Sequence, residues 1–385
     1  MRHNKQLPKP LKSAYTSWEM LERLLPELPP GRNKRLQNPQ SSVNGEVHDW
    51  YRIILGYSDH LVSRLIREFN LRDGDWVLDP FCGSGTTLVE CMKHRINSVG
   101  IDANPSSFFS ARVKANWQIR PEHALKLLGT LRTNYSRFRL DSDAIRQDSS
   151  FRYLHDYGLV ERGWINGSPL ANAIALKIAI SSLPTTSAYR DFLMLALVTE
   201  VVRNASNVKF GPELYCGAPK GRVMLFEGFS RRVESFCKDL QKASLLDAGL
   251  AHVRLGDSRD IKAALFDSPR KTFDAVICSP PYPAEHDYTR NSRLELAFLE
   301  DQISRAHLKK IKLGMIRSHT KGIYKEDDHS EPVIDHKAIN LLAARIDEKA
   351  KLKSYGFARL YSQVLREYFG GMKTHFSSLI KQLKP

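Results

Sequence analysis

VLDPFCGSGTT, residues 77–87, is the stretch that decides the fold. An apolar run meets an aspartate, a turn of small residues follows, and two threonines open the next apolar run, LVECM. This order predicts a strand, a tight turn and a helix, because glycine lets the backbone turn sharply and approach a ligand closely. The key positions are Asp79, Gly83, Gly85, Thr86 and Thr87. By itself the pattern also fits an ordinary turn between a strand and a helix.

Strand and helix patterns alternate on both sides of this stretch. Upstream, WYRIILGYSDHLVSRLIREFN, which begins at Trp50, has apolar residues at helical spacing, and LRDGD predicts a turn. Downstream come the strand INSVGID, the helix ANPSSFFSARVKAN and, much later, the strands AHVRLGD and TFDAVICSPPY. This alternation predicts an α/β fold with a parallel sheet covered on both faces.

A long helical segment interrupts the sheet between its second and third strands. Over residues 121–247 the strand pattern disappears, and HALKLLGTLRTNY, SAYRDFLMLALVTEVVRNA and FSRRVESFCKDLQKASLL show helical spacing. After the fourth strand the chain is again helical, with the polar loop HTKGIYKEDDHSEP between two helices. We therefore predict a helical insertion and a helical C-terminal region.

The composition favours a folded protein with a polyanionic partner. Of 385 residues, 42% are hydrophobic, which suffices for a full core. Lys and Arg total 58 against 42 for Asp and Glu, and the resulting charge of +16 attracts nucleic acid, although a solvated basic surface explains it as well. Five cysteines without a Cys-x-x-Cys pair indicate a reducing cytoplasm, and we expect neither secretion nor membrane insertion.

Acidic residues close the next two strands. Asp102 closes the second strand about twenty residues after the first, where a carboxylate can bind ribose hydroxyls, and Asp257 closes the third. No third glycine and no Lys-Ser/Thr pair completes a dinucleotide fingerprint or a P-loop. A nucleoside without a pyrophosphate therefore fits this end of the sheet better.

A second motif ends the fourth strand, where Ser279, Pro280, Pro281 and Tyr282 follow the apolar run AVIC. In an open parallel sheet this position is the carboxyl edge, where ligands bind. Prolines fix the turn and donate no amide hydrogen, which leaves carbonyl groups free to accept from a substrate amine. Such a tetrad alone is more often a plain loop, and its weight comes from standing in one chain with residues 77–87.

The two motifs together resemble those of the S-adenosylmethionine-dependent amino-methyltransferases that modify DNA, most of all the cytosine-N4 subset. DPFCGSGTT resembles the family's motif I, and SPPY resembles its catalytic tetrad. The resemblance implies a Rossmann-like class I methyltransferase sheet, S-adenosyl-L-methionine as cofactor and double-stranded DNA as partner. The cofactor-binding residues that it implies are Tyr57, Ser58, Asp79, Pro80, Phe81, Gly83, Gly85, Thr86, Thr87, Asp102 and Asp257.

The resemblance also implies a mechanism. The Ser279 hydroxyl and the Pro280 carbonyl would accept the two hydrogens of an exocyclic amine, so that its lone pair points at the methyl group, while Tyr282 stacks on the flipped base. Serine at the first position is the family's usual residue for cytosine N4, whereas Asp or Asn indicates adenine N6. We therefore expect a cytosine-N4 DNA methyltransferase acting on a short target, as in restriction-modification. The alternatives are an adenine-N6, RNA or protein-amide methyltransferase, or a DNA-binding subunit that is inactive alone.

On this resemblance the chain divides into five segments. They are a basic, proline-rich arm (1–45), the cofactor half of the methyltransferase core (46–120), the helical insertion (121–247), the catalytic half of the core (248–300) and the C-terminal helical region (301–385). The insertion serves target recognition or, nearly as well, acts as a structural cap. Its residues Arg203, Lys209, Lys220 and Arg222 either follow DNA phosphates or form an ordinary basic face.

Four predicted strands are fewer than the resemblance implies, since the family's sheet has seven. With the fourth strand inside the sheet, ending there would leave its far edge unpaired and an apolar face partly uncovered. We therefore expect one of three things: a second polypeptide that completes the sheet, a truncated product, or further strands that the patterns do not reveal.

Two other sets of residues invite a chemical role. Cys82 and Cys278 flank the predicted site, but cytosine-C5 enzymes place their nucleophile in a Pro-Cys pair, which the tetrad lacks, so we expect packing residues. The second set has no recognised metal-ligand spacing, and we predict a solvated loop and no metal. Its members are Asp327, Asp328, His329, Glu331, Asp335 and His336.

Overall fold

The predicted parallel sheet is present, and its four strands run in the order β5-β2-β1-β6. The strands are β1 (Trp76–Asp79), β2 (Asn97–Asp102), β5 (Ala251–Leu255) and β6 (Ala275–Val276). Asp79 pairs with Gly100, and Asp102 pairs with Leu255, so the carboxyl ends of the strands meet at one edge. This arrangement confirms the predicted Rossmann-like α/β class.

The computed structural model describes residues 47–51, 56–210, 214–221, 223–352 and 357–385. All of them belong to the larger of the chain's two units, Pro39–Pro385. The predicted arm, residues 1–45, lies outside the described residues. Among the helices of the described part, none combines the length and the apolar character needed to cross a membrane.

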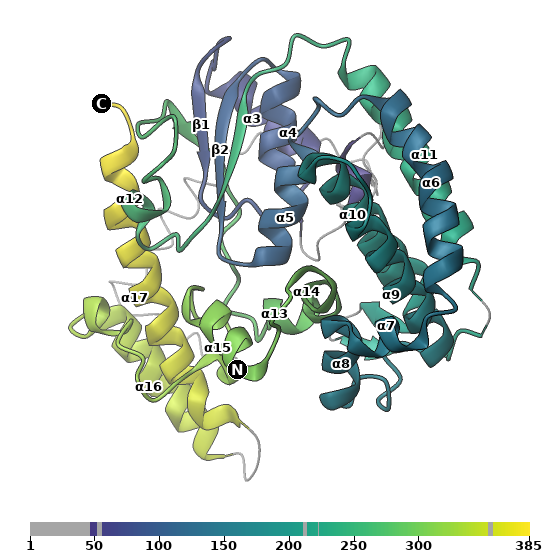
Figure 1. Ribbon diagram of the computed structural model, residues 1–385. Coiled ribbons are helices and arrows are strands. Elements are labelled where there is room, and N and C mark those ends of the chain that lie inside the picture. The colour runs from purple at the N-terminus through teal and green to yellow at the C-terminus, as the bar shows by residue number, and fades with distance from the viewer. Residues whose placement is uncertain (1–46, 52–55, 211–213, 222, 353–356) are drawn as a thin grey trace, which may run out of the picture. The chain divides into compact units, whose positions relative to one another are not determined.

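Helices cover both faces of the sheet (Figure 1). They are α3 (Asp59–Glu68), α4 (Thr86–Lys93), α5 (Pro105–Lys114), α12 (Ile261–Ala264) and α17 (Tyr361–Leu379). Because side chains alternate along a strand, Val77 packs with α3 and α4, whereas Leu78 packs with α12 and α17. Val99 and Ile101 join Leu78, and all three are 0% exposed. The expectation of a partly uncovered apolar face is therefore wrong for these strands, since α12 and α17 cover it.

The first predicted helix begins later than its pattern indicates. A 3-10 turn, η1 (Val47–Trp50), precedes it, and the α-helix begins only at Asp59. Ser58 caps the helix, because its hydroxyl accepts a hydrogen bond from the His60 N–H at 3.2 Å. Residues 52–55 lie outside the described residues.

The insertion is helical as predicted, with one exception. Its elements are α6 (Pro121–Phe138), α7 (Ser142–Gln147), α8 (Ser149–Asp156), α9 (Gly167–Ser181), α10 (Ser187–Glu200), the π-helical turn η2 (Val201–Ala205) and α11 (Leu225–Ala243). It joins the core through α10, which packs on α5. The exception is an antiparallel pair, β3 (Val208–Phe210) with β4 (Leu214–Cys216). Residues 121–247 therefore do contain strands, and three residues are too few to show a two-residue period.

The C-terminal region is helical, as predicted. Two helices, α13 (Tyr288–Asn291) and α14 (Arg293–Leu299), precede this region. Its remaining elements are α15 (Arg305–Leu313), η3 (Thr320–Gly322), η4 (Glu331–Val333), α16 (Lys337–Lys351), η5 (Phe357–Leu360) and η6 (Ile380–Gln382). Just before β6, Phe273 forms a parallel bridge with Leu383, and its N–H donates to the Gln382 carbonyl at 2.8 Å. The chain itself therefore pairs the outer edge next to β6 at this point.

Candidate active site

A cavity at the carboxyl edge of the sheet opens onto about 880 Å³ of empty space, which includes open solvent. Both sequence motifs border it, because β1 and β6 are neighbours and their following turns lie side by side. The predicted site residues that line it are Tyr57, Pro80, Phe81, Gly83, Thr86, Asp102, Ser279, Pro280, Pro281 and Tyr282. Residues far apart in the sequence thus surround one space.

Asp79 and Thr87 are not among the lining residues; both are buried and hold the wall together. The Asp79 carboxylate accepts from the Tyr57 hydroxyl at 2.8 Å and from the Phe81 N–H at 3.1 Å. Thr87 contacts the same tyrosine hydroxyl. Burial raises the pKa of Asp79 to about 6, against the lowering effect of these hydrogen bonds. The network fixes the turn after β1.

Ser58 and Gly85, which are also absent from the lining, have local structural roles. Ser58 caps α3, and Gly85 occupies the N-cap position of α4 with φ +86°, a conformation that favours glycine. A Cβ at Gly85 would also lie 3.1 Å from the Cβ of Ala111 on α5. This glycine therefore permits the turn and the close packing of α4 on α5.

Asp102 is placed to accept hydrogen bonds from hydroxyl groups. It lines the cavity, and its carboxylate accepts from the Gly83 N–H at 2.9 Å and the Asn104 N–H at 2.8 Å. A carboxylate offers about four lone-pair positions, so acceptor capacity remains for a ligand. Burial raises the pKa of Asp102 to about 7, although the two backbone hydrogen bonds lower it.

Asp257 does not line the cavity, whereas its neighbour Ser258 does. The backbone N–H and the Nε–H of Arg259 donate to the Asp257 carboxylate at 2.8 and 2.9 Å. Arg259 also donates to the Leu313 carbonyl at 2.6 Å, which ties the end of β5 to α15. The carboxylate thus faces an arginine, and its cofactor role stays a prediction.

The tetrad forms the loop after β6. The Tyr282 side chain is 46% exposed, which leaves a ring face for stacking, and its N–H donates to the Tyr288 hydroxyl at 3.2 Å. The Tyr368 hydroxyl of α17 donates to the Pro281 carbonyl at 3.0 Å. Within the described part of the chain, the Ser279 hydroxyl and the Pro280 carbonyl have no hydrogen-bond partner. Both acceptors therefore remain available to a ligand.

The cysteines beside the tetrad are poor nucleophiles in this setting. Burial raises the pKa of the Cys278 thiol to about 12, and it raises the pKa of the Cys82 thiol well above its usual range. A protonated thiol reacts weakly, because the thiolate is the nucleophilic form. This supports the expected packing role.

Sequence reasoning missed several residues of the site. Asn104, Ser258 and Tyr288 line the cavity, as does the segment 314–316 that follows α15. Asn104 had a detectable signal, because Asn-Pro is a helix start and Asn104 caps α5 two residues after Asp102. The segment 314–316 belongs to no motif, and only the packing of α15 brings it here.

Helix α17 contacts several residues that line the cavity. Besides Tyr368, its His375 is 1% exposed, contacts the Phe81 ring with centroids 4.8 Å apart, and hydrogen-bonds through Nδ1 to the Ser258 carbonyl at 2.8 Å. One helix of the C-terminal region thus supports both the cofactor half and the catalytic half.

The predicted DNA-binding residues of the insertion gather around the β3–β4 pair. The Lys220 ammonium donates to the Arg203 carbonyl at 3.1 Å, and the charge of Lys209 contributes to the lowered pKa of Lys220, after burial. The Arg203 guanidinium donates to the Asp49 carbonyl at 3.2 Å. Arg222 lies outside the described residues. Contact with DNA stays a prediction for all four.

The polar loop before α16 is less solvated than predicted. Arg317 and Asp327 form an ion pair at 2.7 Å with side chains only 2% and 1% exposed. His329 instead contacts Arg259 and lies 3.8 Å from Glu367. The expectation of a solvated loop is therefore wrong at Asp327, because folding brings Arg317 to it.

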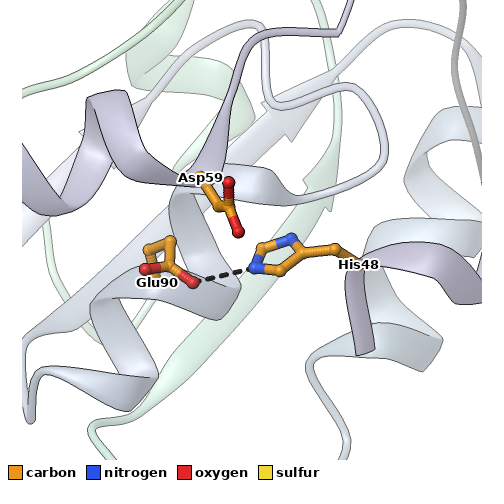
Figure 2. A group of neighbouring side chains, drawn as sticks. All are labelled: His48, Asp59 and Glu90. Carbon is orange, nitrogen blue, oxygen red and sulfur yellow. Dashed lines mark hydrogen bonds and ion pairs between the residues drawn. The ribbon is translucent and has the colours of Figure 1, made fainter. Parts of the chain in front are cut away.

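Figure 2 shows another group of metal-ligand types, His48, Asp59 and Glu90, whose ligand atoms lie within 4.8 Å of one another. Glu90 accepts a hydrogen bond from His48 at 2.8 Å and lies 3.0 Å from the Lys93 ammonium. Burial would raise the pKa of Glu90, but the hydrogen bond from His48 and the charge of Lys93 help to bring it down to about 2. These contacts tie η1 to α4, and the prediction that the chain holds no metal is left untested.

The fold and the residues around the cavity match the family expected from the two motifs, and comparisons with known proteins agree. Residues 34–111 match the family model N6_N4_Mtase, described as DNA methylase. Together with the relatives described next, this match confirms the family expected from the two motifs. The comparisons therefore support an S-adenosylmethionine-dependent DNA methyltransferase of the N4/N6 class.

Three relatives carry the name type II methyltransferase. M.BsoBI of Geobacillus stearothermophilus is 27% identical over 330 residues, 78% of this chain and 64% of the relative. M.AvaI of Anabaena variabilis is 24% identical over 285 residues, 69% of this chain and 57% of the relative. M.MjaII of Methanocaldococcus jannaschii is 56% identical over 50 residues, 13% of this chain and 9% of the relative. The chain thus spans less than two thirds of these relatives, and no solved structure matches it.

Proposed function

We propose that this chain is a DNA methyltransferase that transfers a methyl group from S-adenosyl-L-methionine to the exocyclic N4 amine of cytosine in a short target sequence. One observation carries the proposal: Asp102, Ser279 and Tyr282 line the same cavity. An acceptor for ribose hydroxyls, an acceptor for an amine and a stacking ring thus surround one space. The relatives' names support the methyl-transfer reaction.

The residues at the cofactor end of the cavity fit a nucleoside. Asp102 supplies a partly free carboxylate, and Pro80 and Phe81 supply apolar walls beside the Gly83 turn. This turn lacks the third glycine that pyrophosphate binding requires, which suits a cofactor without a pyrophosphate. When bound, S-adenosylmethionine supplies a methyl group that its positive sulfur makes electrophilic.

The tetrad prepares the amine for attack. The cytosine amine is a poor nucleophile because its lone pair is delocalised into the ring. When the Ser279 hydroxyl and the Pro280 carbonyl accept its two hydrogens, the nitrogen can become pyramidal and its lone pair can point at the methyl carbon. In the transfer, the nitrogen would form its bond to the methyl carbon as the methyl–sulfur bond breaks, and the methylated nitrogen would then release one N–H proton to solvent. The two acceptors orient the N–H groups through hydrogen bonds.

The exposed ring of Tyr282 serves the base itself. A duplex hides the amine in the base stack, so the nucleotide must rotate out of the helix and find a new stacking surface. Tyr282 offers that surface at the rim of the cavity. Serine at the first tetrad position, by the family resemblance, favours cytosine over adenine as this base.

The test is the identity of the methylated product. The purified chain is incubated with methyl-labelled cofactor and, in parallel, with duplex DNA, transfer RNA and protein extract. We expect label in DNA alone, and N4-methylcytosine after digestion to nucleosides and mass spectrometry. Ser279→Ala is the matched control and should form product about 100-fold more slowly.

The other products have definite meanings. N6-methyladenine would contradict the choice of base but keep the DNA substrate. Label in RNA or protein alone would contradict DNA as substrate. DNA binding without any transfer would indicate the subunit alternative, in which catalysis needs another polypeptide.

A further inference from the structure

A basic groove lies beside the active-site cavity, bordered by the segment after α8, by α13 to α15 and by the loop after α15. It opens onto about 1230 Å³ of empty space. Its basic side chains are Arg162, Arg290, Arg293, Arg305, Lys309, Lys312 and Lys321. Among the described residues that line the groove, one is acidic, Asp287. The lining therefore has seven positive side chains and one negative side chain.

A second hollow among the described residues does not share this excess. The hollow around Arg203 is lined by three arginines and three acids, and its charges balance. In that hollow Arg232 pairs with Glu200 at 2.7 Å. The groove has an excess of six (7 − 1), which makes it the more attractive of the two to a polyanion.

The acidic side chain of the groove, Asp287, already forms an ion pair. Asp287 accepts from the Lys312 ammonium at 2.7 Å, and both side chains are largely buried. Arg305, Lys309 and Lys321 are instead exposed. Lys309 lies 3.8 Å from Glu326, whose side chain is 72% exposed, and so loose a surface pair neutralises little charge. The exposed cations are therefore available to bind phosphate.

Aromatic rings position two of these cations. The Arg305 guanidinium lies 5.5 Å from the centre of the Tyr157 ring, and the Lys309 ammonium lies 4.8 Å from that of Tyr324. A ring attracts a cation without cancelling its charge, unlike a carboxylate. The groove thus orients its positive groups and keeps them positive.

The groove and the cavity share one wall. Asp287 and Thr289 line the groove, whereas Tyr288 between them lines the cavity. In the same way Lys312 lines the groove and Gly314 lines the cavity. A flipped nucleotide remains joined to its backbone, so a base held in the cavity leaves its phosphates just outside. The groove lies on the other side of this shared wall from the cavity.

We infer that the groove binds the phosphodiester backbone of the DNA strand whose base enters the cavity. The inference rests on the proposed function and adds to it the surface that holds the strand. Lys and Arg bind phosphate oxygens without reading sequence, so the groove sets the position and the register of the duplex. Reading of the target sequence falls to other residues.

The test compares two triple variants of the full chain that lose equal charge. The groove variant is R305Q/K309Q/K321Q, and the control is K126Q/K238Q/K242Q, whose residues are exposed on α6 and α11. Fluorescence anisotropy measures their affinity for one labelled duplex over a salt series. For each phosphate that the groove variant no longer binds, we expect a log–log slope shallower by about 0.9 and, at about 0.1 M salt, an affinity lower by about eightfold. The control should match the unaltered chain.

Each outcome either supports or contradicts the inference about the groove. Equal affinities and slopes in the two variants would overturn the inference, while methyl transfer to cytosine N4 in DNA by the unaltered chain would show that the proposed function stands. Loss of affinity in the groove variant supports the groove even if the unaltered chain transfers no methyl group, which would count against the function alone. An unaltered chain that binds no duplex DNA refutes both. If the triple variant unfolds by circular dichroism, R305Q and K321Q are measured singly, each with the change expected for one phosphate.

Discussion

Asp102 serves the fold and the site with the same two oxygens. They hold the turn after β1 through Gly83 and the start of α5 through Asn104, while the side chain borders the cavity. Because burial raises its pKa to about 7, the carboxyl group changes charge near neutral pH. An ionised carboxylate accepts from two ribose hydroxyls, whereas the protonated form has fewer acceptor positions. The cofactor site should therefore respond to pH.

Cofactor affinity is expected to rise with pH through this residue. A raised pKa means that Asp102 is protonated below about pH 7 and ionised above it. Affinity should be about tenfold weaker at pH 6 than at pH 8, since the ionised fraction changes in that proportion. Calorimetric titration of S-adenosylmethionine measures it, with Asp102→Asn as control. An equally steep pH dependence in the Asn variant would rule out Asp102 as its source.

Mutations at the two ends of the cavity should have different effects on turnover and on cofactor affinity. Ser279→Ala and Tyr282→Ala remove an amine acceptor and a stacking ring, and each should lower turnover by about 100-fold while leaving cofactor affinity unchanged. Asp102→Ala should instead weaken cofactor binding by about 1.5–3 kcal/mol, the range for hydrogen bonds to a charged group. Calorimetry and methyl-transfer rates measure both effects. Loss of the cofactor in Ser279→Ala would show that this role assignment is wrong.

Among the elements, the loop between α15 and α16 depends on one buried ion pair. Asp327 accepts from Arg317 at 2.7 and 3.0 Å and from the Tyr324 N–H at 2.8 Å. Arg317 also donates to two carbonyls at the end of α15. Burial opposes ionisation of Asp327, yet these contacts lower its pKa. The pair thus joins the loop to the helix whose following segment borders the cavity.

Breaking this pair should destabilise the chain strongly. Asp327→Ala leaves the Arg317 charge buried and unpaired, which costs about 3 kcal/mol. Its neighbour Asp328 is exposed, and Asp328→Ala should cost less than about 0.5 kcal/mol. Urea denaturation measures both. Because the pKa of Asp327 is lowered, the difference between the two variants should shrink as the pH falls below about 4. Equal stabilities at neutral pH would contradict the importance of the pair.

At the scale of the whole molecule, backbone contacts join the basic groove to the β3–β4 strand pair. The segment that follows α8 brings Arg162 and Trp164 to the groove, and the Trp164 carbonyl accepts from the Asn207 N–H at 2.8 Å just before β3. Ile165 and Ser206 form an antiparallel bridge at the same place. The strand pair that carries Lys209 is thus joined to the wall of the groove.

Neutralising both regions tests whether they act on one duplex. The strand-pair variant K209Q/K220Q/R222Q should lower DNA affinity and flatten its salt dependence without changing cofactor affinity. Added to the groove variant, its effect on log affinity should be additive, because the two regions would contact different phosphates. Anisotropy over a salt series measures the four chains. Unchanged slope in the strand-pair variant would remove it from the interface and leave the groove as the DNA contact.

The sequence alone was enough to predict the alternation of strands and helices in the core and the meeting of the two motifs at one edge of the sheet. Glycine, proline and the strand period act locally, so VLDPFCGSGTT and VICSPPY reveal strand ends without knowledge of the rest. Parallel strands then bring those ends to one edge, which is why Asp102 and Ser279 could be placed in one site in advance. The late start of α3 was not predicted. The strands β3 and β4 were missed because three residues are too few to show a two-residue period.

Only the tertiary structure decided what surrounds that edge. Segment 314–316, Tyr368 and the basic groove come from helices and loops outside the two motifs, and their positions follow from how these elements pack. The burial of Asp327 was hidden for the same reason, since a charged loop appears solvated until the chain brings Arg317 to it. Local patterns encode backbone conformation, whereas contacts between distant side chains depend on how whole helices pack on the sheet.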